Sequence, residues 1–202
     1  MKKAKYFLMA IPILLLVSGC LTSQDAFYEE NDIVVDDRLV GTYGDKIVNP
    51  QSSSQFSITK DEDYYHKGRY YITITSGQDC SMKFAAVSFQ IGTNRFLDLL
   101  PVIEPCDRIP ANPPSMIEIL QATTIQPMHM VVKVDANTNG VGFSFLDNAG
   151  LMDLTKKYPE YFRLKTDEMP RMVPDTKRQR EFLLRFGSDT NIFKVINIKR
   201  EK

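Results

Sequence analysis

Two histidines, and the acidic residues beside one of them, are the side chains in this sequence best suited to chemistry. Asp61, Asp63 and His66 lie close together in the chain, and carboxylates with an imidazole can bind a metal ion. Their spacing matches no named metal site, and the composition of the segment is typical of a solvated acidic turn. His129 falls on the polar face of an alternating segment. We therefore expect no metal, no cofactor and no catalytic histidine.

Common catalytic signatures do not occur in the sequence. It contains no Gly-rich phosphate loop, no His-Glu-X-X-His and no Gly-X-Ser-X-Gly. His129 could belong to a Ser-His-Asp triad, but nothing in the sequence indicates its serine. The adjacent carboxylates Asp36 and Asp37 would point to opposite faces of a strand, so they would not converge on one glycosidic bond. We expect a non-catalytic protein, with an enzyme as the open alternative.

The N-terminal segment has the three parts of a secretory signal peptide. Three lysines give it a positive start, residues 6–17 are uncharged and apolar, and small residues precede Cys20. An apolar run of about 12 residues is too short to cross about 30 Å of hydrocarbon as a helix. We predict a signal peptide over residues 1–19, with an uncleaved membrane anchor as the alternative.

The four residues Val17-Ser18-Gly19-Cys20 resemble the lipobox of bacterial lipoproteins. The resemblance implies a diacylglyceryl group on the Cys20 sulfur, cleavage after Gly19 and, commonly, acylation of the new N-terminus. Two or three acyl chains hold a protein firmly on a membrane, so the implied partner is a membrane of the cell envelope. In a host with two membranes we expect the outer one, facing the periplasm, because Leu21 lacks the aspartate that resembles an inner-membrane retention signal.

Residues 20–36 are mostly polar and acidic, and we expect them to form a lipidated flexible tether before a single domain over residues 37–202. Removing the three lysines of the signal segment leaves 22 basic residues against 25 acidic ones. A surface that binds nucleic acid needs an excess of Lys and Arg, so no nucleic-acid partner is expected.

Alternation of apolar and polar residues dominates the domain and predicts short β-strands. The expected strands are 38–43, 55–59, 69–76, 83–91, 95–100, 128–134, 141–145 and 191–199. Short helices are expected over 115–122, 149–157 and 177–186. Alternation implies one buried face and one wet face, which favours antiparallel pairing. The expected fold class is mainly β, a single antiparallel barrel or a sandwich with two or three short helices.

Residues 39–43, Leu-Val-Gly-Thr-Tyr, resemble the Gly-X-Trp motif that opens lipocalin-like barrels, with Tyr43 where that family usually has tryptophan. The resemblance implies a barrel whose interior either fills with side chains or holds one small ligand. The residues expected to line a site for a hydrophobic molecule or lipid are Phe56, Tyr70, Ile72, Phe84, Phe89, Phe143 and Phe145. Alternatively, such rings form an ordinary core, and the protein is a structural or interaction subunit of an envelope complex.

Two cysteines remain besides Cys20, and an oxidising compartment favours a disulfide between Cys80 and Cys106. A hairpin is predicted around Thr93. With its turn centred on that residue, the numbers of paired residues would add to 186, which would place the two cysteines opposite each other. Two buried free thiols are the alternative.

Overall fold

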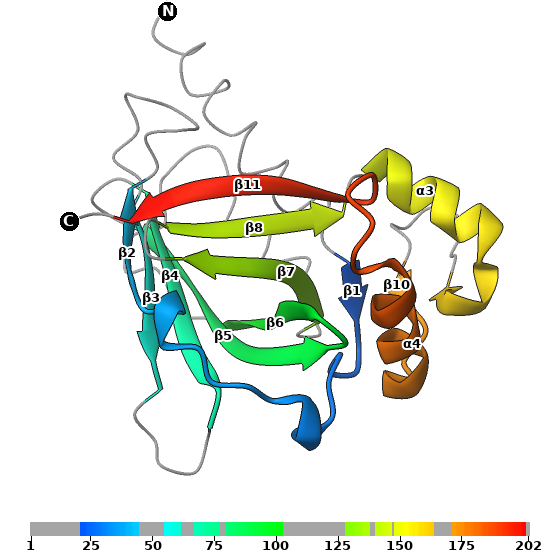
Figure 1. The fold of residues 1–202 in the computed structure, drawn as a ribbon, viewed down its shortest axis with the longest axis horizontal. Helices are drawn as coiled ribbons and strands as arrows, with labels where there is room; N and C mark the ends of the chain where they lie inside the picture. Colours follow the sequence, from blue (N-terminus) through cyan, green and yellow to red (C-terminus); the bar gives the residue numbers. More distant parts are fainter. Residues whose placement is uncertain are drawn as a thin grey trace, which may run out of the picture.

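Eight antiparallel strands close into a barrel in the computed structural model, and two helices pack against one side of it (Figure 1). The structure describes residues 21–44, 55–61, 67–76, 80–102, 128–137, 140–146, 148–163 and 171–200. The prediction of a mainly β protein with an antiparallel barrel is confirmed, and the sandwich alternative is wrong.

Each barrel strand pairs with two other barrel strands. The strands are β2 (Gly41–Gly44), β3 (Gln55–Lys60), β4 (Arg69–Ser76), β5 (Cys80–Ile91), β6 (Asn94–Val102), β7 (His129–Asn137), β8 (Gly140–Leu146) and β11 (Phe193–Arg200). Their order in space is β7-β6-β5-β4-β3-β2-β11-β8, and pairing of β8 with β7 closes the ring. Two very short strands, β9 (Phe162–Arg163) and β10 (Arg171–Met172), form a separate antiparallel pair.

The tight turn between β5 and β6 fixes the register of this part of the barrel. Ile91 pairs with Asn94, and Lys83 pairs with Val102, so the numbers of paired residues add to 185. Gly92 occupies the turn with a φ of 60°, a left-handed conformation that glycine adopts without strain. The expected register of 186 is therefore wrong by one position.

That shift removes the geometric argument for the disulfide. A change of register by one residue moves side chains to the opposite face of a sheet, so the ladder does not place Cys80 opposite Cys106. Within the described strands, Cys80 instead pairs with Ser76 on β4. Cys106 lies outside the described residues. The disulfide between Cys80 and Cys106 therefore stays a prediction, which rests only on the expectation that the protein is in an oxidising compartment.

Two α-helices occur among the described residues, α3 (Asn148–Lys157) and α4 (Thr176–Phe186). Both lie within one residue of their expected bounds. Asp175 caps α4, because its side chain accepts hydrogen bonds from the backbone N–H groups of Lys177 and Arg178. The helix expected over residues 115–122 lies outside the described residues.

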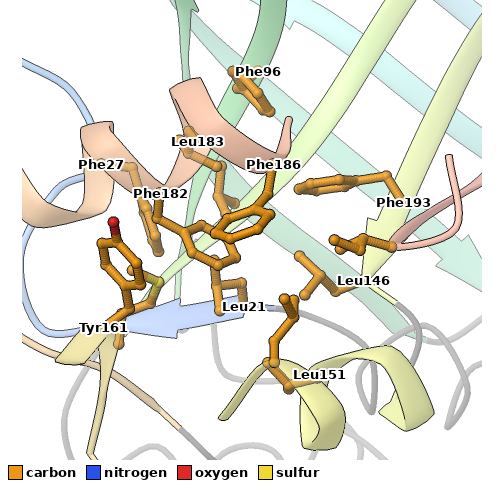
Figure 2. Close-up of a cluster of buried hydrophobic side chains, with 14 of the residues drawn as sticks. Leu21, Phe27, Phe96, Leu146, Leu151, Tyr161, Phe182, Leu183, Phe186 and Phe193 are labelled. Atoms are coloured by element: carbon orange, nitrogen blue, oxygen red, sulfur yellow. The ribbon is translucent and has the colours of Figure 1, made fainter. Parts of the chain in front are cut away.

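A hydrophobic cluster outside the barrel joins the helices to its wall. Leu183 and Phe186 of α4, Leu151 of α3 and Leu146 of β8 point toward one another (Figure 2). The ring centroids of Phe182 and Phe186 lie 5.0 Å apart. The barrel wall under the helices is therefore buried on both faces.

The N-terminal segment is part of the fold and not the expected flexible tether. Leu21–Ser23 form strand β1, which pairs antiparallel with β7 and lies between the barrel and α4 (Figure 1). Phe27 is fully buried in the cluster outside the barrel. Farther along, the N–H of Val34 donates to the carbonyl of Ser88 on β5. These residues bury apolar surface, which holds the segment in place.

Candidate functional site

The barrel interior is the apolar region in which the expected ligand-binding residues meet. Alternation along each strand turns every second side chain inward, and the register lines these side chains up between strands. Ile58 of β3 pairs with Ile72 of β4, and Ile72 pairs with Phe84 of β5. These three side chains form a continuous row across three strands.

Burial within the interior is graded. Tyr43, Ile58, Tyr70 and Ile72 are at most 2% exposed. Other interior side chains pack against this core but are only partly buried, namely Val40, Phe56, Ile74, Phe84, Leu99, Phe145 and Ile198. The interior therefore combines a tightly filled core with an apolar margin that solvent still reaches.

Two tyrosine hydroxyls help close the filled part of the interior. The Tyr43 hydroxyl donates to the carbonyl of Leu39 at 2.6 Å, and the Tyr70 hydroxyl accepts from the N–H of Asp36 at 2.7 Å. Burial raises the pKa of Tyr70 above its ordinary value of 10.0. The Arg200 guanidinium lies 5.7 Å from the centroid of the Tyr43 ring, a cation–π contact. Tyr43, the residue in the lipocalin-like motif, thus belongs to the closed part of the barrel.

Six of the seven expected ligand-binding residues belong to this interior cluster. They are Phe56, Tyr70, Ile72, Phe84, Phe143 and Phe145. Three of these rings touch in series, with centroids 5.3 Å apart for Phe56 and Phe143 and 6.4 Å apart for Phe143 and Phe145. The structure thus brings the six together in one cluster.

Phe89 is the exception, and placing it in the interior site was wrong. Its ring lies outside the barrel, 5.5 Å from that of Phe96 and 5.6 Å from that of Tyr28. Phe84 and Phe89 are five positions apart on β5, and an odd separation puts two side chains on opposite faces of a strand. The odd difference between the two residue numbers was therefore enough to predict, from the sequence, that only one of these rings lies inside the barrel.

A buried polar group that the sequence did not reveal lies outside the barrel, under the N-terminal segment. Asp98 on β6 is 3% exposed. Both of its carboxylate oxygens lie 3.0 Å from Nδ1 of His129, and one accepts the N–H of Phe27 at 3.2 Å. The expectation that His129 lies on a wet strand face was wrong, because β1 and the residues after it cover that face.

Each partner of the Asp98–His129 pair changes the titration of the other. The Asp98 carboxylate beside the imidazole raises the pKa of His129 above its ordinary value of 6.5. Burial raises the pKa of Asp98 above 3.8, although the histidine opposes that shift. The pair therefore favours a charged histidine next to a carboxylate that has few other partners.

Ser23, His129 and Asp98 together supply the three residue types of a Ser-His-Asp acyl-transfer triad, but the serine is not accessible to solvent. Ser23 faces His129 across the β1–β7 ladder. Its hydroxyl accepts a 2.6 Å hydrogen bond from Nε2 of Gln179 on α4, and the residue is fully buried. A substrate has no path to this hydroxyl in the structure. The polar group therefore connects β1, β6, β7 and α4 and does not form an open site.

The predicted acidic turn near His66 falls on residues 62–66, which lie outside the described residues. Among the residues that are described, no group of three or more His, Cys, Asp or Glu side chains is arranged to hold a metal ion.

A small surface cavity lies on the outer side of β7, β8 and β11. Its volume is about 170 Å³, and Lys133, Asp135, Ser144 and Asn197 are among its lining residues. Binding sites for drug-sized molecules usually enclose about 300–1,000 Å³. The cavity is therefore too small to serve as the expected hydrophobic site.

In the part of the chain that the structure describes, neither helix has the length and apolar character needed to cross a membrane.

Comparison with known proteins adds no relative: no protein-family model, no curated protein and no solved structure matches the chain.

Proposed function

We propose that this chain is a lipid-anchored envelope protein whose barrel binds a small hydrophobic ligand or lipid chain at the partly exposed margin of its interior. The gradient of burial among the interior side chains carries the proposal. Phe56, Phe84 and Phe145 present apolar rings that stay partly accessible beside a filled core. An apolar chain laid on these rings would remove that surface from water, at about 25 cal/mol per Å².

The membrane anchor is the second part of the proposal. The lipobox-like residues before Leu21 support acylation of Cys20. In a host with two membranes we place the protein in the outer membrane, facing the periplasm. An apolar binding margin held near a bilayer fits a ligand that is itself poorly soluble in water.

The anchor predicts a labelling result. Labelled palmitate should enter the wild-type protein, and Cys20→Ser should abolish its incorporation, because the thiol that accepts the lipid is gone. Cys80→Ser serves as the matched control and should keep the label. Equal labelling of the wild type and Cys20→Ser would contradict the lipoprotein assignment.

The binding margin predicts a loss of affinity on substitution. Phe84→Gln should weaken binding of a fluorescent fatty acid about tenfold, since about 1.4 kcal/mol of apolar contact is removed. Leu184→Gln, at a position on α4 that is 63% exposed, is the control and should bind as the wild type does. Unfolding curves of both variants would confirm that each remains folded at the assay temperature.

One observation favours a second candidate, a non-catalytic structural or interaction subunit of an envelope complex. The inner core is filled by its own side chains, with Tyr43, Tyr70 and Leu97 at most 1% exposed. Native mass spectrometry of detergent-extracted protein distinguishes the two. A bound small molecule supports the ligand-binding barrel, and a stoichiometric protein partner without a ligand supports the subunit.

A further inference from the structure

The small cavity on the outer side of the barrel is a trough that runs along β8. This strand lies between β7 and β11 (Figure 1). Phe143 and Phe145 belong to the interior cluster, so Gly142 and Ser144 point outward. Gly142 has no side chain, and Ser144 has a short one and is only 6% exposed. The outer surface is therefore lowest along β8.

The wall on the β7 side carries two opposite charges. Lys133 pairs with Ser144, and Asp135 pairs with Gly142. Residues two apart on a strand point to the same face, about 7 Å apart along it. The Lys133 ammonium donates to the carbonyl of Gly187 at 2.8 Å, which fixes the direction of the side chain. An ammonium has three N–H donors, so this one bond does not exhaust its capacity.

The opposite wall and one end of the trough come from the turn after α4 and from β11. Val195 and Asn197 lie across β8 from the two charges, and Val195 is 56% exposed. Phe193 and Asp189 also line the cavity. One oxygen of the Asp189 carboxylate accepts the N–H of Asn191 at 2.8 Å, so this group already stabilises the turn. The cavity thus combines a charged wall with an aliphatic one.

The glycine in the floor keeps the cavity open. The φ of Gly142 is not positive, so the backbone does not require a glycine there. A Cβ atom at this position would lie 2.9 Å from Oδ1 of Asn197 and 3.6 Å from Cγ1 of Val195. Glycine weakens a strand interior, and it often marks a place where a ligand approaches the backbone closely.

We propose that this cavity binds a free α-amino acid with a small aliphatic side chain, its carboxylate beside Lys133 and its ammonium group beside Asp135. The aliphatic side chain would lie against Val195. The volume of about 170 Å³ suits such a ligand, because a cavity of about 150 Å³ holds a six-carbon ring. Arg38 also acts on Asp135 through space, but its guanidinium is hydrogen-bonded to Asp36.

The pair of opposite charges favours a zwitterion over other small polar molecules. A sugar would displace water from both charged groups without supplying an opposite charge to either. A simple carboxylate would suit Lys133 but would place a second negative charge near Asp135. An amino acid supplies a partner to each group.

Isothermal titration calorimetry of the full-length mature protein in detergent micelles tests the proposal. L-valine should bind saturably, with a Kd of about 1 mM or lower. Two analogues each remove one charge, since 3-methylbutanoate lacks the ammonium group and 2-methylpropylamine lacks the carboxylate. Each should bind at least about tenfold more weakly than L-valine. D-glucose is the neutral comparison and should not bind.

Three variants locate the site. Asp135→Asn removes one charge and should weaken L-valine binding about tenfold. Gly142→Ala fills the floor and should weaken binding to a similar extent, while the protein stays at least as stable, because alanine costs a strand less than glycine does. Asp153→Asn, at an exposed position on α3, is the matched control and should bind as the wild type does. Thermal unfolding of each variant shows whether it is folded.

The remaining outcomes contradict the proposal at different points. If glycine, L-alanine, L-valine and L-leucine all fail to bind up to about 10 mM, the cavity is not an amino-acid site. Equal binding of L-valine and 3-methylbutanoate would refute the zwitterion. Binding of D-glucose alone would make the cavity a sugar site. Wild-type affinity in both folded variants, Asp135→Asn and Gly142→Ala, would place the bound amino acid elsewhere on the protein.

Discussion

Phe27→Ala is expected to lower the free energy of unfolding by about 3–5 kcal/mol, the usual cost of truncating a buried aromatic side chain. The Phe27 ring is fully buried in the cluster outside the barrel. Its backbone N–H also donates to Asp98, so loosening of this residue would expose a buried carboxylate. Urea unfolding of the detergent-solubilised protein, followed by circular dichroism, measures the change.

Val35→Ala is the matched control in the same N-terminal segment. Val35 is 53% exposed, and the substitution should change the free energy of unfolding by less than about 0.5 kcal/mol. If residues 20–36 were a flexible tether, Phe27→Ala would be equally mild. A loss below about 1 kcal/mol for Phe27→Ala would therefore contradict the packed segment.

The barrel could be predicted from the sequence because its signal is local. Alternation within each strand reports that one face is apolar, and this pattern needs no knowledge of which strands become neighbours. Tyr70, Ile72 and Ile74 alternate with more polar residues on β4, and they do point into the interior cluster. Of the seven residues that this pattern assigned to the interior, six lie there.

The cluster outside the barrel could not be found in this way, because it depends on segments far apart in the chain. It covers the outer face of β5, β6 and β7 with residues from both ends of the protein. A sign of it was nevertheless present on β6, where Phe96 and Leu97 are adjacent and both buried. Adjacent large apolar residues in a strand indicate that both faces are covered.

The error about the N-terminal segment has a similar physical origin. Its acidic residues suggested solvent, but Phe27, Tyr28, Ile33 and Val34 are apolar or aromatic and do not suit a solvated linker. Several of the acidic groups are also paired in the fold. Arg180 on α4, for example, lies 2.9 Å from Glu29 and 2.7 Å from Asp32. Charge alone was therefore a poor guide to exposure here.

The largest effect of a polar substitution is expected at the Asp98–His129 pair. His129→Ala should lower the free energy of unfolding by roughly 2–3 kcal/mol, somewhat less than for a fully buried ion pair, because the ring is 23% exposed. The substitution leaves the Asp98 carboxylate buried, with the Phe27 N–H as a remaining donor. His129→Gln is the matched variant, since its amide N–H can still donate to Asp98 while the side chain no longer titrates.

The pair also predicts a pH dependence of stability with a definite sign. The fold raises the pKa of His129 above 6.5, so the folded state binds this proton more tightly than the unfolded chain does. The stabilisation is complete below pH 6.5 and is lost as the pH rises through the folded-state pKa. The wild-type free energy of unfolding should therefore fall as the pH rises above 6.5, and in His129→Gln it should fall much less. Since the chain has only two histidines, His66→Gln provides the control and should keep the wild-type slope. If His129→Gln keeps that slope as well, His129 is not the titrating group, and the charged pair does not account for the pH dependence.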